Sequence, residues 1–376
     1  MNDRPPADFP ACDVAVVGSG AAGLAAAISA ARAGCATRLI DPRTGPGGIA
    51  GFSGLTTLCG LFDEAGDWLN GGFSREFAEA LAEGPPVRQE RVWLLSYQPE
   101  RFRSRAAEFL AATPGLTVHW GTPLDRVRVE DGHIVQLNDF PVRAVIDCSG
   151  TAEVARLAGS ACLATDETTQ APAVIFPLHG VHHDCSSPLA NLRLLLPLAR
   201  AGLPPLHLQP GRELDTVTAK FSGPPAQVEE VITVLRREVT GFANCSSPAR
   251  EFHRTPRAGR MILGRHVLSG SDILTARKFP DGVVRGAWPV EQWNAAGQCR
   301  LRYLPAGAYY DIPAQSLRAT EPGNLFMAGK TISADVDAIA SARVMGCCLA
   351  TGAAAGQLAA AWVRSGADSP GTPIAR

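Results

Sequence analysis

The chain has 376 residues, more than one hydrophobic core usually holds, so two structural units are expected. Hydrophobic residues make up 46% and charged residues 19% of it, as in globular proteins. The 35 Lys and Arg residues nearly balance the 36 Asp and Glu residues, so charge gives no reason to expect a nucleic acid or a membrane surface as partner. A small molecule is the partner to expect.

The cysteines and the two chain ends give further expectations. The ten cysteines show no Cys-x-x-Cys spacing and no Cys/His cluster, so we expect no metal site and mostly buried, reduced thiols. Residues 1–6 contain no apolar run of the kind that a signal peptide needs, and a cytoplasmic location is expected. The apolar segment 338–363 carries Arg343 and Gln357, and the run between them is shorter than the roughly 20 residues that span a bilayer. We expect it to be a buried helix.

A strand, a glycine turn and a helix are predicted near the N-terminus. The short apolar run at 13–17, which contains three β-branched valines, is followed by Gly-Ser-Gly-Ala-Ala-Gly and then by an alanine-rich stretch. In this pattern Gly18 permits a tight turn, Gly20 lets the backbone approach a pyrophosphate, and Gly23 lets the helix pack closely on the strand. The helix N-terminus then offers N–H groups and a partial positive charge to phosphates.

An acidic residue follows the next predicted strand. Residues 36–40 form that strand, and Asp41 lies 18 residues after Gly23. An acid at this position suits the hydroxyl groups of a ribose and repels a 2′-phosphate. The agreement of strand, spacing, helix and acid predicts a dinucleotide site, although these residues do not distinguish NAD from FAD.

Four further segments decide between the two cofactors. Residues 46–48 (Pro-Gly-Gly) form a double-glycine loop, and 144–150 form an apolar strand that ends in an Asp-x-x-Gly turn. Residues 324–330 are typical of a final strand and turn, and 338–344 of the start of a closing helix. In this order the segments resemble the FAD-dependent oxidoreductase family, which is related to the glutathione-reductase type of flavoprotein.

The resemblance implies that FAD is the cofactor and that both ends of the chain bind it. It also implies that the closing helix directs its positive N-terminal end at the flavin, where it stabilises the negative charge of the reduced ring. Together with the glycine motif, it assigns to FAD binding the residues Gly18, Gly20, Ala22, Gly23, Asp41, Arg43, Gly48, Leu124, Ser149, Gly150, Gly329, Ala340, Ser341, Arg343 and Val344.

The expected fold class is α/β, with a Rossmann-type FAD-binding domain interrupted by a smaller α+β substrate domain. The FAD-binding domain would have a parallel sheet, helices and a small antiparallel meander. Strand–helix alternation is lost in the middle of the chain, so we expect FAD-binding parts at 1–157 and 299–376 and the insert at 158–298. Within the insert, 213–221 alternates as a strand does, and 225–240 has the spacing of an amphipathic helix.

Three residues are candidates for catalysis or substrate binding. Arg257 and Arg260 match arginines of the similar family, which implies a place over the flavin or on a substrate carboxylate, where a planar guanidinium binds well. A structural salt bridge would explain them equally well. Tyr310 lies in a segment that resembles the family's entry to the flavin site and would donate a hydrogen bond to the substrate. Packing alone would also explain an aromatic residue there.

The chain departs from the family at one pair of positions. Glu291 and Trp293 stand where the family often has Asp and His. If that histidine transfers protons, this protein either uses another residue, for which His253 is an option, or catalyses a different reaction.

The function expected is that of an FAD-dependent oxidoreductase that dehydrogenates, reduces or hydroxylates a small organic substrate. NAD(P)H and O₂ are candidates for transient electron partners, since no second Gly-x-Gly-x-x-Gly unit offers a stable nicotinamide site. Two alternatives stay open. A flavoprotein that modifies a protein side chain during maturation of another enzyme would have a wide, shallow substrate face. A non-catalytic scaffold would bind FAD without turnover.

Overall fold

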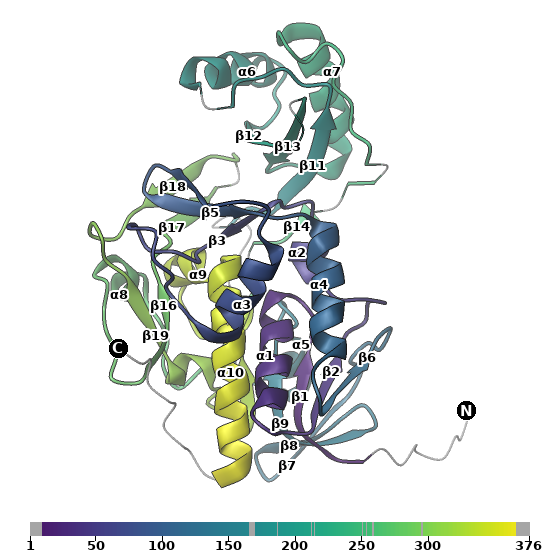
Figure 1. Cartoon of the computed structure of the whole chain (residues 1–376), viewed down its shortest axis with the longest axis vertical. Coiled ribbons are helices and arrows are strands. Elements are labelled where there is room, and N and C mark those ends of the chain that lie inside the picture. The colour runs from purple at the N-terminus through teal and green to yellow at the C-terminus, as the bar shows by residue number, and fades with distance from the viewer. Residues whose placement is uncertain are drawn as a thin grey trace.

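The computed structural model describes residues 10–164, 170–185, 187–211, 213, 215–249, 251–252, 254–257, 259–294 and 296–365. His253, which the sequence analysis named as an option for proton transfer, lies outside them. Figure 1 shows a large α/β body and, at its top, a smaller lobe that contains α6 (Pro188–Arg200) and α7 (Val228–Glu238).

A seven-stranded sheet forms the centre of the larger body. Its strands follow the order β6-β2-β1-β9-β8-β7, and β20 also pairs with β9. The strands β6, β2, β1, β9 and β20 run parallel, whereas β7, β8 and β9 form an antiparallel meander. This arrangement confirms the predicted fold class. The strands are β1 (Cys12–Val17), β2 (Thr37–Ile40), β6 (Leu116–His119), β7 (Val127–Glu130), β8 (His133–Leu137), β9 (Phe140–Asp147) and β20 (Leu325–Met327).

Helices and small antiparallel sheets complete the larger body. The sheets β3-β5-β4 and β17-β18 lie directly below the lobe in Figure 1. The small sheets consist of β3 (Thr57–Cys59), β5 (Val92–Ser96) and β4 (Val87–Gln89); β17 (Val290–Trp293) and β18 (Cys299–Arg302); β16 (Gly282–Gly286) and β19 (Tyr310–Pro313); and β10 (Cys162–Ala164) and β15 (Arg260–Ile262). The shorter helices are α2 (Gly48–Phe52), α3 (Gly72–Leu81), α4 (Pro99–Ala111), α5 (Glu153–Ala158), α8 (Gly270–Leu274) and α9 (Val336–Ala342).

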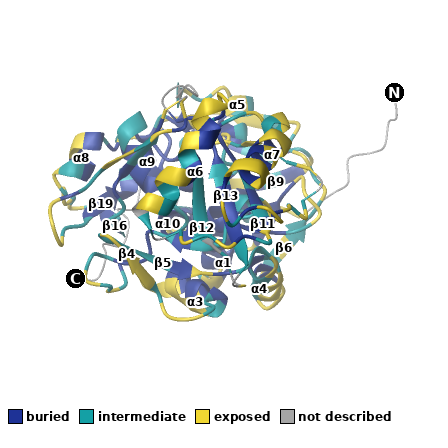
Figure 2. Ribbon diagram, turned by 90° about the horizontal axis from the view of Figure 1, so that it is seen from above, coloured by how far each residue is buried: buried dark blue, intermediate teal, exposed yellow. Residues whose placement is uncertain are grey.

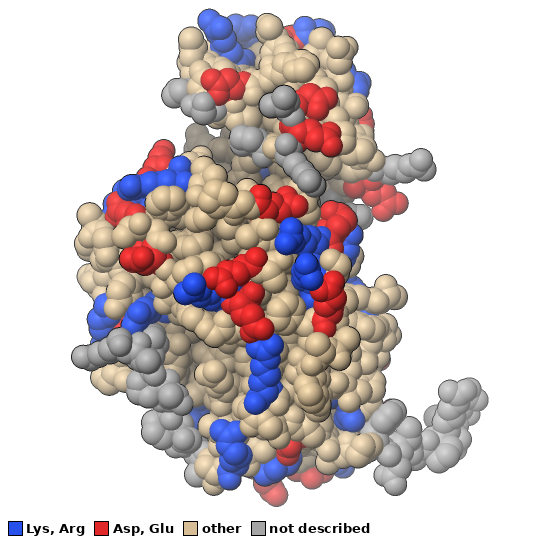
Figure 3. All heavy atoms as spheres, in the orientation of Figure 1, with Lys and Arg blue, Asp and Glu red and all other residues tan. Residues whose placement is uncertain are grey.

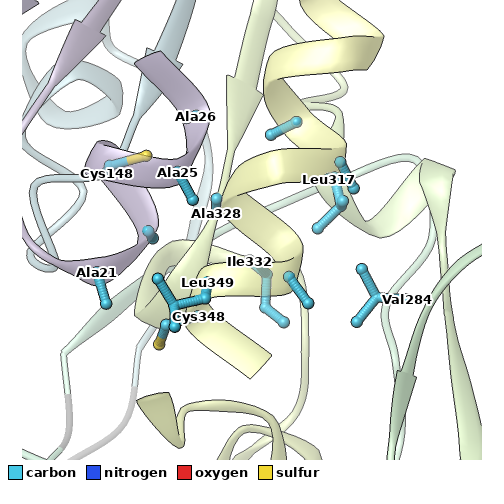
Figure 4. Packing of buried hydrophobic residues seen from close by; sticks show 14 of the residues in the cluster. Ala21, Ala25, Ala26, Cys148, Val284, Leu317, Ala328, Ile332, Cys348 and Leu349 are labelled. Atoms are coloured by element: carbon cyan, nitrogen blue, oxygen red, sulfur yellow. The ribbon is translucent and has the colours of Figure 1, made fainter. Parts of the chain in front are cut away.

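Two helices from opposite ends of the chain pack backbone to backbone. They are α1 (Ala21–Arg32) and α10 (Met345–Ser365), which run side by side in Figure 1. A Cβ atom added to Gly352 of α10 would lie only 2.1 Å from the carbonyl oxygen of Ala22. Figure 4 shows part of the core around this contact, in which Ala25 of α1 lies in the same cluster as Ala328 and Leu349. The C-terminal segment is thereby fixed against the glycine turn.

The closing helix differs from its prediction at one point. The segment 338–363 is largely buried as expected, but it is divided, because α9 ends at Ala342 and α10 begins at Met345. Among the described residues, α10 is the one helix long and apolar enough to cross a membrane by length and composition. In this fold 78% of its apolar window is buried within the protein, as in the core helix of a globular body. All ten cysteines are free thiols and most are buried.

The lobe has its own core. Its antiparallel sheet has the order β12-β13-β11-β14, formed by β12 (Leu206–Pro210), β13 (Thr216–Phe221), β11 (Ala173–His179) and β14 (Arg254–Thr255). The predicted strand and helix in this region are confirmed as β13 and α7. Both helices lie on the outer side of the sheet, and the view from above in Figure 2 shows their exposed faces. Phe176, Phe221 and Leu235 are buried between sheet and helices.

The boundaries of the insert, expected at 158 and 298, stay a prediction. The core of the lobe is formed by residues between Val174 and Cys245. Met261, Val284 and Val290 lie later in the expected insert, yet they belong to the core of the larger body.

The surface carries charges of both signs. On the face shown in Figure 3, basic and acidic side chains are interspersed. Several charged side chains of the protein form pairs, as Arg32 does with Glu76 at 2.6 Å and Arg75 with Glu79 at 2.8 Å. Exposed pairs of this kind contribute at most about 1 kcal/mol each, so they matter more for solubility than for the fold.

The contact between α1 and α10 gives a prediction for stability. Ala normally stabilises a helix by about 1 kcal/mol relative to Gly. At position 352 we expect the reverse, because a Cβ atom 2.1 Å from a carbonyl oxygen must push the two helices apart, and overpacking costs roughly 1–3 kcal/mol. Chemical denaturation of Gly352→Ala should therefore show a clear loss of unfolding free energy. Gly45→Ala is the control, since a Cβ there meets nothing within 4 Å; equal stability of the two variants would contradict the packing described.

Candidate functional site

A cavity of about 460 Å³ opens at the N-terminus of α1. We call it the glycine-rich cavity because five glycines of the central turns contribute to its wall. It is lined by eleven residues that the sequence analysis assigned to the cofactor, namely Gly18, Gly20, Ala22, Asp41, Arg43, Gly48, Leu124, Ser149, Gly150, Gly329 and Arg343. The fold thus brings together residues from both ends of the chain.

Four other assigned residues do not line this cavity. Gly23 lies behind it, where a Cβ atom would be 1.7 Å from the carbonyl oxygen of Gly18, so its role is to let the turn close on the helix. Ala340 and Ser341 are fully buried in α9 and line neither this cavity nor its neighbour. Val344 lines the neighbouring cavity instead.

The expected role of the closing helix toward the flavin stays a prediction, and its two parts, α9 and α10, differ in their position relative to the cavity. The N-terminus of α9 is capped by Asp335, whose carboxylate accepts hydrogen bonds from the amides of Ala338 and Gly270. This end therefore points to α8. The wall is reached instead by the beginning of α10, through Met345 and Cys348.

The first turn of α1 presents backbone donors to the glycine-rich cavity. Its N-cap residue is Gly20, which has no side chain to bind these N–H groups, and no acidic residue occurs in the first turn. A Cβ atom on Gly20 would meet only the Cα of Gly48, at 3.9 Å, so the backbone borders open space. Such a helix end is a ready-made site for phosphate groups.

Asp41 orders the glycine turn. Its side chain is only 2% exposed, and its Oδ2 accepts hydrogen bonds from the backbone N–H and the hydroxyl of Ser19, at 2.6 and 2.7 Å. Its Oδ1 accepts a third from the amide of Arg43, at 2.8 Å. Asp41 lines the cavity as well. The predicted contact with a ribose stays a prediction, and the structure adds a second role in holding the turn.

Asp147 orders the turn that follows β9, at residues 147–150, as Asp41 orders the glycine turn. This fully buried carboxylate accepts hydrogen bonds from the amide and hydroxyl of Ser149 and from the amides of Val154 and Ala155. Burial raises the pKa of Asp147, and these hydrogen bonds oppose that effect. The network fixes Ser149 and Gly150 at the cavity wall and caps the start of α5.

A second cavity, of about 370 Å³, adjoins the first below the sheet of the lobe. We call it the tryptophan cavity because Trp288 and Trp293 line it. The inner face of the lobe sheet, the sheet β3-β5-β4 and the hairpin β17-β18 all contribute to its wall. Both cavities are lined by the same five residues, which form a shared wall: Ile49, Pro256, Lys330, Arg343 and Met345.

A buried carboxylate organises the tryptophan cavity. The two oxygens of Glu291 accept hydrogen bonds from the indole N–H groups of Trp293 and Trp288, at 2.6 and 2.9 Å, and Lys220 Nζ lies 3.9 Å away. Burial alone would raise the pKa of Glu291, but the charges of Lys220 and Arg343 and the two indole donors lower it to about 2. Glu291 is therefore an ionised group that orients both rings. This explains structurally why an acid and a tryptophan stand at these positions.

Arg257 lies beside the ring of Trp293 and is 6% exposed. Its Nη1 donates to the carbonyl of Ala171 and to the hydroxyl of Ser222, and its guanidinium carbon is 4.3 Å from the centre of Trp293. Among the described residues, its buried Nη2 has no hydrogen-bond partner. Burial and the charge of Arg343 lower the pKa of Arg257 to about 9.

The other two candidates for catalysis lie elsewhere. Arg260 is exposed on β15 and lines neither cavity. Tyr310 is fully buried, shares a hydrogen bond of 2.8 Å with the hydroxyl of Ser341, and also lines neither cavity. Their catalytic roles stay predictions, and of the three candidates the structure brings only Arg257 into a cavity.

The shared wall carries two cations. Lys330 Nζ donates to the carbonyl of Pro256 at 3.2 Å, and burial together with the charge of Arg343 lowers the pKa of Lys330 to about 8. Arg343 Nη2 donates to Gln170 Oε1 at 3.2 Å, while its buried Nε has no partner among the described residues. A positive charge is thus available on the boundary between the two cavities.

Two cavity lysines were missed by the sequence analysis. Lys330 ends the segment 324–330 that carried the resemblance, and only the glycine before it was assigned a role. Lys220 is the one charged residue in the otherwise uncharged strand β13, and it lies on the inner face of the lobe sheet. A charge inside a half-buried strand was the signal that would have identified it.

The sequence profile described as FAD dependent oxidoreductase matches residues 13–201 and 208–370. The chain belongs to this family of FAD-dependent oxidoreductases. The resemblance inferred from the sequence is therefore confirmed, and FAD is the cofactor. No protein in a curated collection matched the chain.

Solved structures of other proteins show the same fold. GidA from Aquifex aeolicus is 13% identical, with a TM-score of 0.53, and the match covers 97% of this chain and 65% of that one. The flavin-dependent brominase Bmp2 is 12% identical, with a TM-score of 0.50, and the match covers 95% of this chain and 80% of that one. This chain therefore spans less than two thirds of the length of GidA. At such identities the likeness shows the fold alone.

The residues of the glycine-rich cavity fit FAD. The uncapped first turn of α1 suits the phosphates, and Gly20 leaves room for them. The cations Arg43, Lys330 and Arg343 also line the cavity and match the negative charge of a dinucleotide. The volume of about 460 Å³ falls in the range of cofactor sites.

The space beside Gly20 gives a prediction for FAD binding. Gly20→Val should fold normally, because Gly20 has an extended backbone and a Cβ meets nothing closer than 3.9 Å. The added side chain would occupy the place of the phosphates, so we expect purified protein without the yellow colour of flavin. The measurements are the visible spectrum and the thermal unfolding of the protein prepared without FAD. Gly45→Val, outside the cavity, is the control; a yellow Gly20→Val protein with normal FAD content would refute this phosphate site.

The pKa of Lys330 gives a second prediction. In the protein without FAD this pKa is about 8, and the negative charge of bound FAD should raise it. FAD binding then takes up a proton above about pH 8, so the affinity for FAD should fall there by up to about tenfold per pH unit. The measurement is the dissociation constant for FAD, obtained by adding FAD to the FAD-free protein at several pH values between about pH 7 and pH 9. Lys330→Arg should bind FAD as tightly as the wild type does at neutral pH, without the pH dependence. Lys330→Met should lose the pH dependence and also bind FAD more weakly. An identical pH profile for wild type and Lys330→Met would be the contrary result.

Proposed function

We propose that this chain is an oxidoreductase whose FAD reacts, across the shared wall, with a small organic substrate held in the tryptophan cavity. The observation that carries the proposal is that Ile49, Pro256, Lys330, Arg343 and Met345 line both cavities. A ligand in one cavity is therefore adjacent to a ligand in the other. When bound, FAD supplies the electron transfer that side chains alone do not perform.

The side chains around the shared wall have distinct roles in this proposal. Lys330 and Arg343 hold positive charge beside the cofactor, which favours its reduced, more negative form. Glu291 holds the rings of Trp288 and Trp293 in place as one side of the substrate chamber. These rings and the lobe above them reduce the access of water to the reacting groups.

The size of the tryptophan cavity favours a small molecule as substrate. A volume of about 370 Å³ lies within the range of pockets that enclose metabolites and drug-sized ligands. His207 is a candidate neutral base in this chamber: its ring meets Trp293 edge to face, and burial and the charge of Lys220 lower its pKa. Dehydrogenation, reduction and hydroxylation are all compatible with this arrangement, and NAD(P)H and O₂ remain the proposed electron partners.

Anaerobic reduction of the bound flavin is the experiment that tests this proposal. Under our proposal, the visible flavin absorption of the FAD-loaded protein bleaches with NADH, NADPH or an oxidisable small molecule, and returns when an electron acceptor is admitted. The flavin-free Gly20→Val protein serves as the blank. A flavin that no reductant of this kind bleaches, and whose spectrum no small organic ligand changes, would support a non-catalytic scaffold and overturn the proposal.

A further inference from the structure

We propose that the substrate of the tryptophan cavity is an organic carboxylic acid, with its carboxylate bound between Arg257 and Lys220 and its apolar body against the opposite wall. This inference rests on the proposed function, because it names the class of molecule that the chamber accepts. It is argued from the charges, the unpaired donor and the apolar lining of the cavity.

The four cations of the cavity wall fall into two pairs, and the acids Glu90 and Glu291 line the same wall. Lys330 and Arg343 belong to the shared wall and lie against the cofactor. Lys220 and Arg257 line only the tryptophan cavity, so the cofactor does not account for them. Glu291 pairs with Lys220 at 3.9 Å but makes no ion pair with Arg257 among the described residues, so the two cations together still favour an anion in the chamber.

Arg257 offers an unused hydrogen-bond donor. Its Nη1 is held by Ala171 and Ser222, and the face of its guanidinium lies over Trp293, so the group has a fixed position. Its Nη2 is buried and has no partner within the described part of the chain, and the Arg257 side chain lines the cavity. Buried guanidinium nitrogens in proteins are normally satisfied, and an oxygen anion is the partner that suits them best.

Lys220 also lies beside the ring of Trp293. Its Nζ lies 4.3 Å from the centre of Trp293 and 3.9 Å from Glu291 Oε1. Glu291 already accepts two indole hydrogen bonds, and a separation of 3.9 Å leaves Lys220 without a close hydrogen bond to it. The ammonium group therefore has donors to spare for a ligand oxygen.

The local charge balance favours a carboxylate over a phosphate. Around Trp293, the basic groups of Lys220 and Arg257 face one carboxylate, Glu291, which leaves a positive surplus of one; Glu90, the other acid of the wall, is exposed and accepts a hydrogen bond from Tyr303. A singly charged carboxylate neutralises this surplus. A doubly charged phosphate ester would leave a negative charge in a largely buried chamber, close to Glu291.

The rest of the chamber suits an apolar or aromatic body. Aliphatic side chains from four elements or their flanks line the chamber, namely Leu55, Val92, Leu94, Ile175 and Leu208. Trp288 and Trp293 add flat aromatic surface next to the cations. The combination of an apolar enclosure with a few convergent polar groups is typical of sites that bind one orientation of a small ligand.

Binding of three matched probes to the FAD-loaded protein tests the inference. The probes are benzoate, its neutral counterpart benzamide, and phenyl phosphate, and the readout is the change in the visible absorption of the bound flavin. We expect benzoate to bind at least tenfold more tightly than either of the others. Arg257→Met and Lys220→Met should each weaken benzoate binding by about tenfold or more, the effect of losing one charge-assisted hydrogen bond, and leave benzamide binding almost unchanged.

Two controls separate binding from folding. Arg200→Met removes an exposed arginine of α6, outside both cavities, and should bind benzoate as the wild type does. Arg257 also anchors Ala171 and Ser222, so if Arg257→Met fails to fold, Lys220→Met carries the test, because no such backbone bond holds Lys220 among the described residues.

The outcomes distinguish this inference from the proposed function. Equal binding of benzoate and benzamide, with a clear flavin response to both, would overturn the carboxylate site and leave the substrate chamber standing. Tighter binding of phenyl phosphate would overturn the assignment to a carboxylate in favour of a phosphate. No flavin response to any probe would overturn the carboxylate site, and the anaerobic reduction of the bound flavin would then decide the proposed function by itself.

Discussion

The backbone contact between α1 and α10 is the constraint on which the site depends. At Gly352 the two helices approach so closely that not even a methyl group fits between them. The N-terminus of α1 is the phosphate-binding end of the glycine turn, and the N-terminal end of α10 follows Arg343 at the shared wall. Because the helices touch, residues more than 300 positions apart in the chain, such as Gly20 and Arg343, line one cavity.

The electrostatics of the two cavities follow from burial. Each cation at the wall loses solvation, and for Lys330 and Arg257 this lowers the pKa to about 8 and about 9. In the low dielectric of such a site, a charge that remains unpaired is strongly attracted to any anion that enters. Glu291 compensates one of these charges only, and it does so while its oxygens hold two tryptophans in place. The chamber is therefore rigid in shape and positive in charge before a ligand binds.

Much of this site could be predicted because its sequence signals are local. The turn at 18–23 and Asp41 follow one another along a strand, a helix and a second strand, and their spacing alone brings them to one cavity. The break between α9 and α10 could not be found in this way, since Arg343 and Val344 interrupt an apolar, alanine-rich run that contains no proline. The sequence analysis therefore began the closing helix at 338 and included Ala340 and Ser341, which tertiary packing buries elsewhere.

The tryptophan cavity was the part least accessible from the sequence. Arg257 and Arg260 are three residues apart, yet one is buried beside Trp293 and the other is exposed on β15. Lys220 belongs to β13 and Arg257 follows β14 of the same lobe sheet, so the packing of the lobe against the hairpin β17-β18 brings both cations to Trp293. Distances between separate sheets leave no periodic trace in a single sequence, which is why the anionic preference emerged only from the structure.

A crystal structure of the FAD-reconstituted protein would test the central claim most directly. Our account predicts that the FAD phosphates bind the first-turn N–H groups of α1 beside Gly20. It also predicts that the flavin ring contacts Lys330, Arg343 and Met345, with one face or edge open to the tryptophan cavity. A flavin ring bound away from these residues, with the tryptophan cavity closed off from it, would contradict the account.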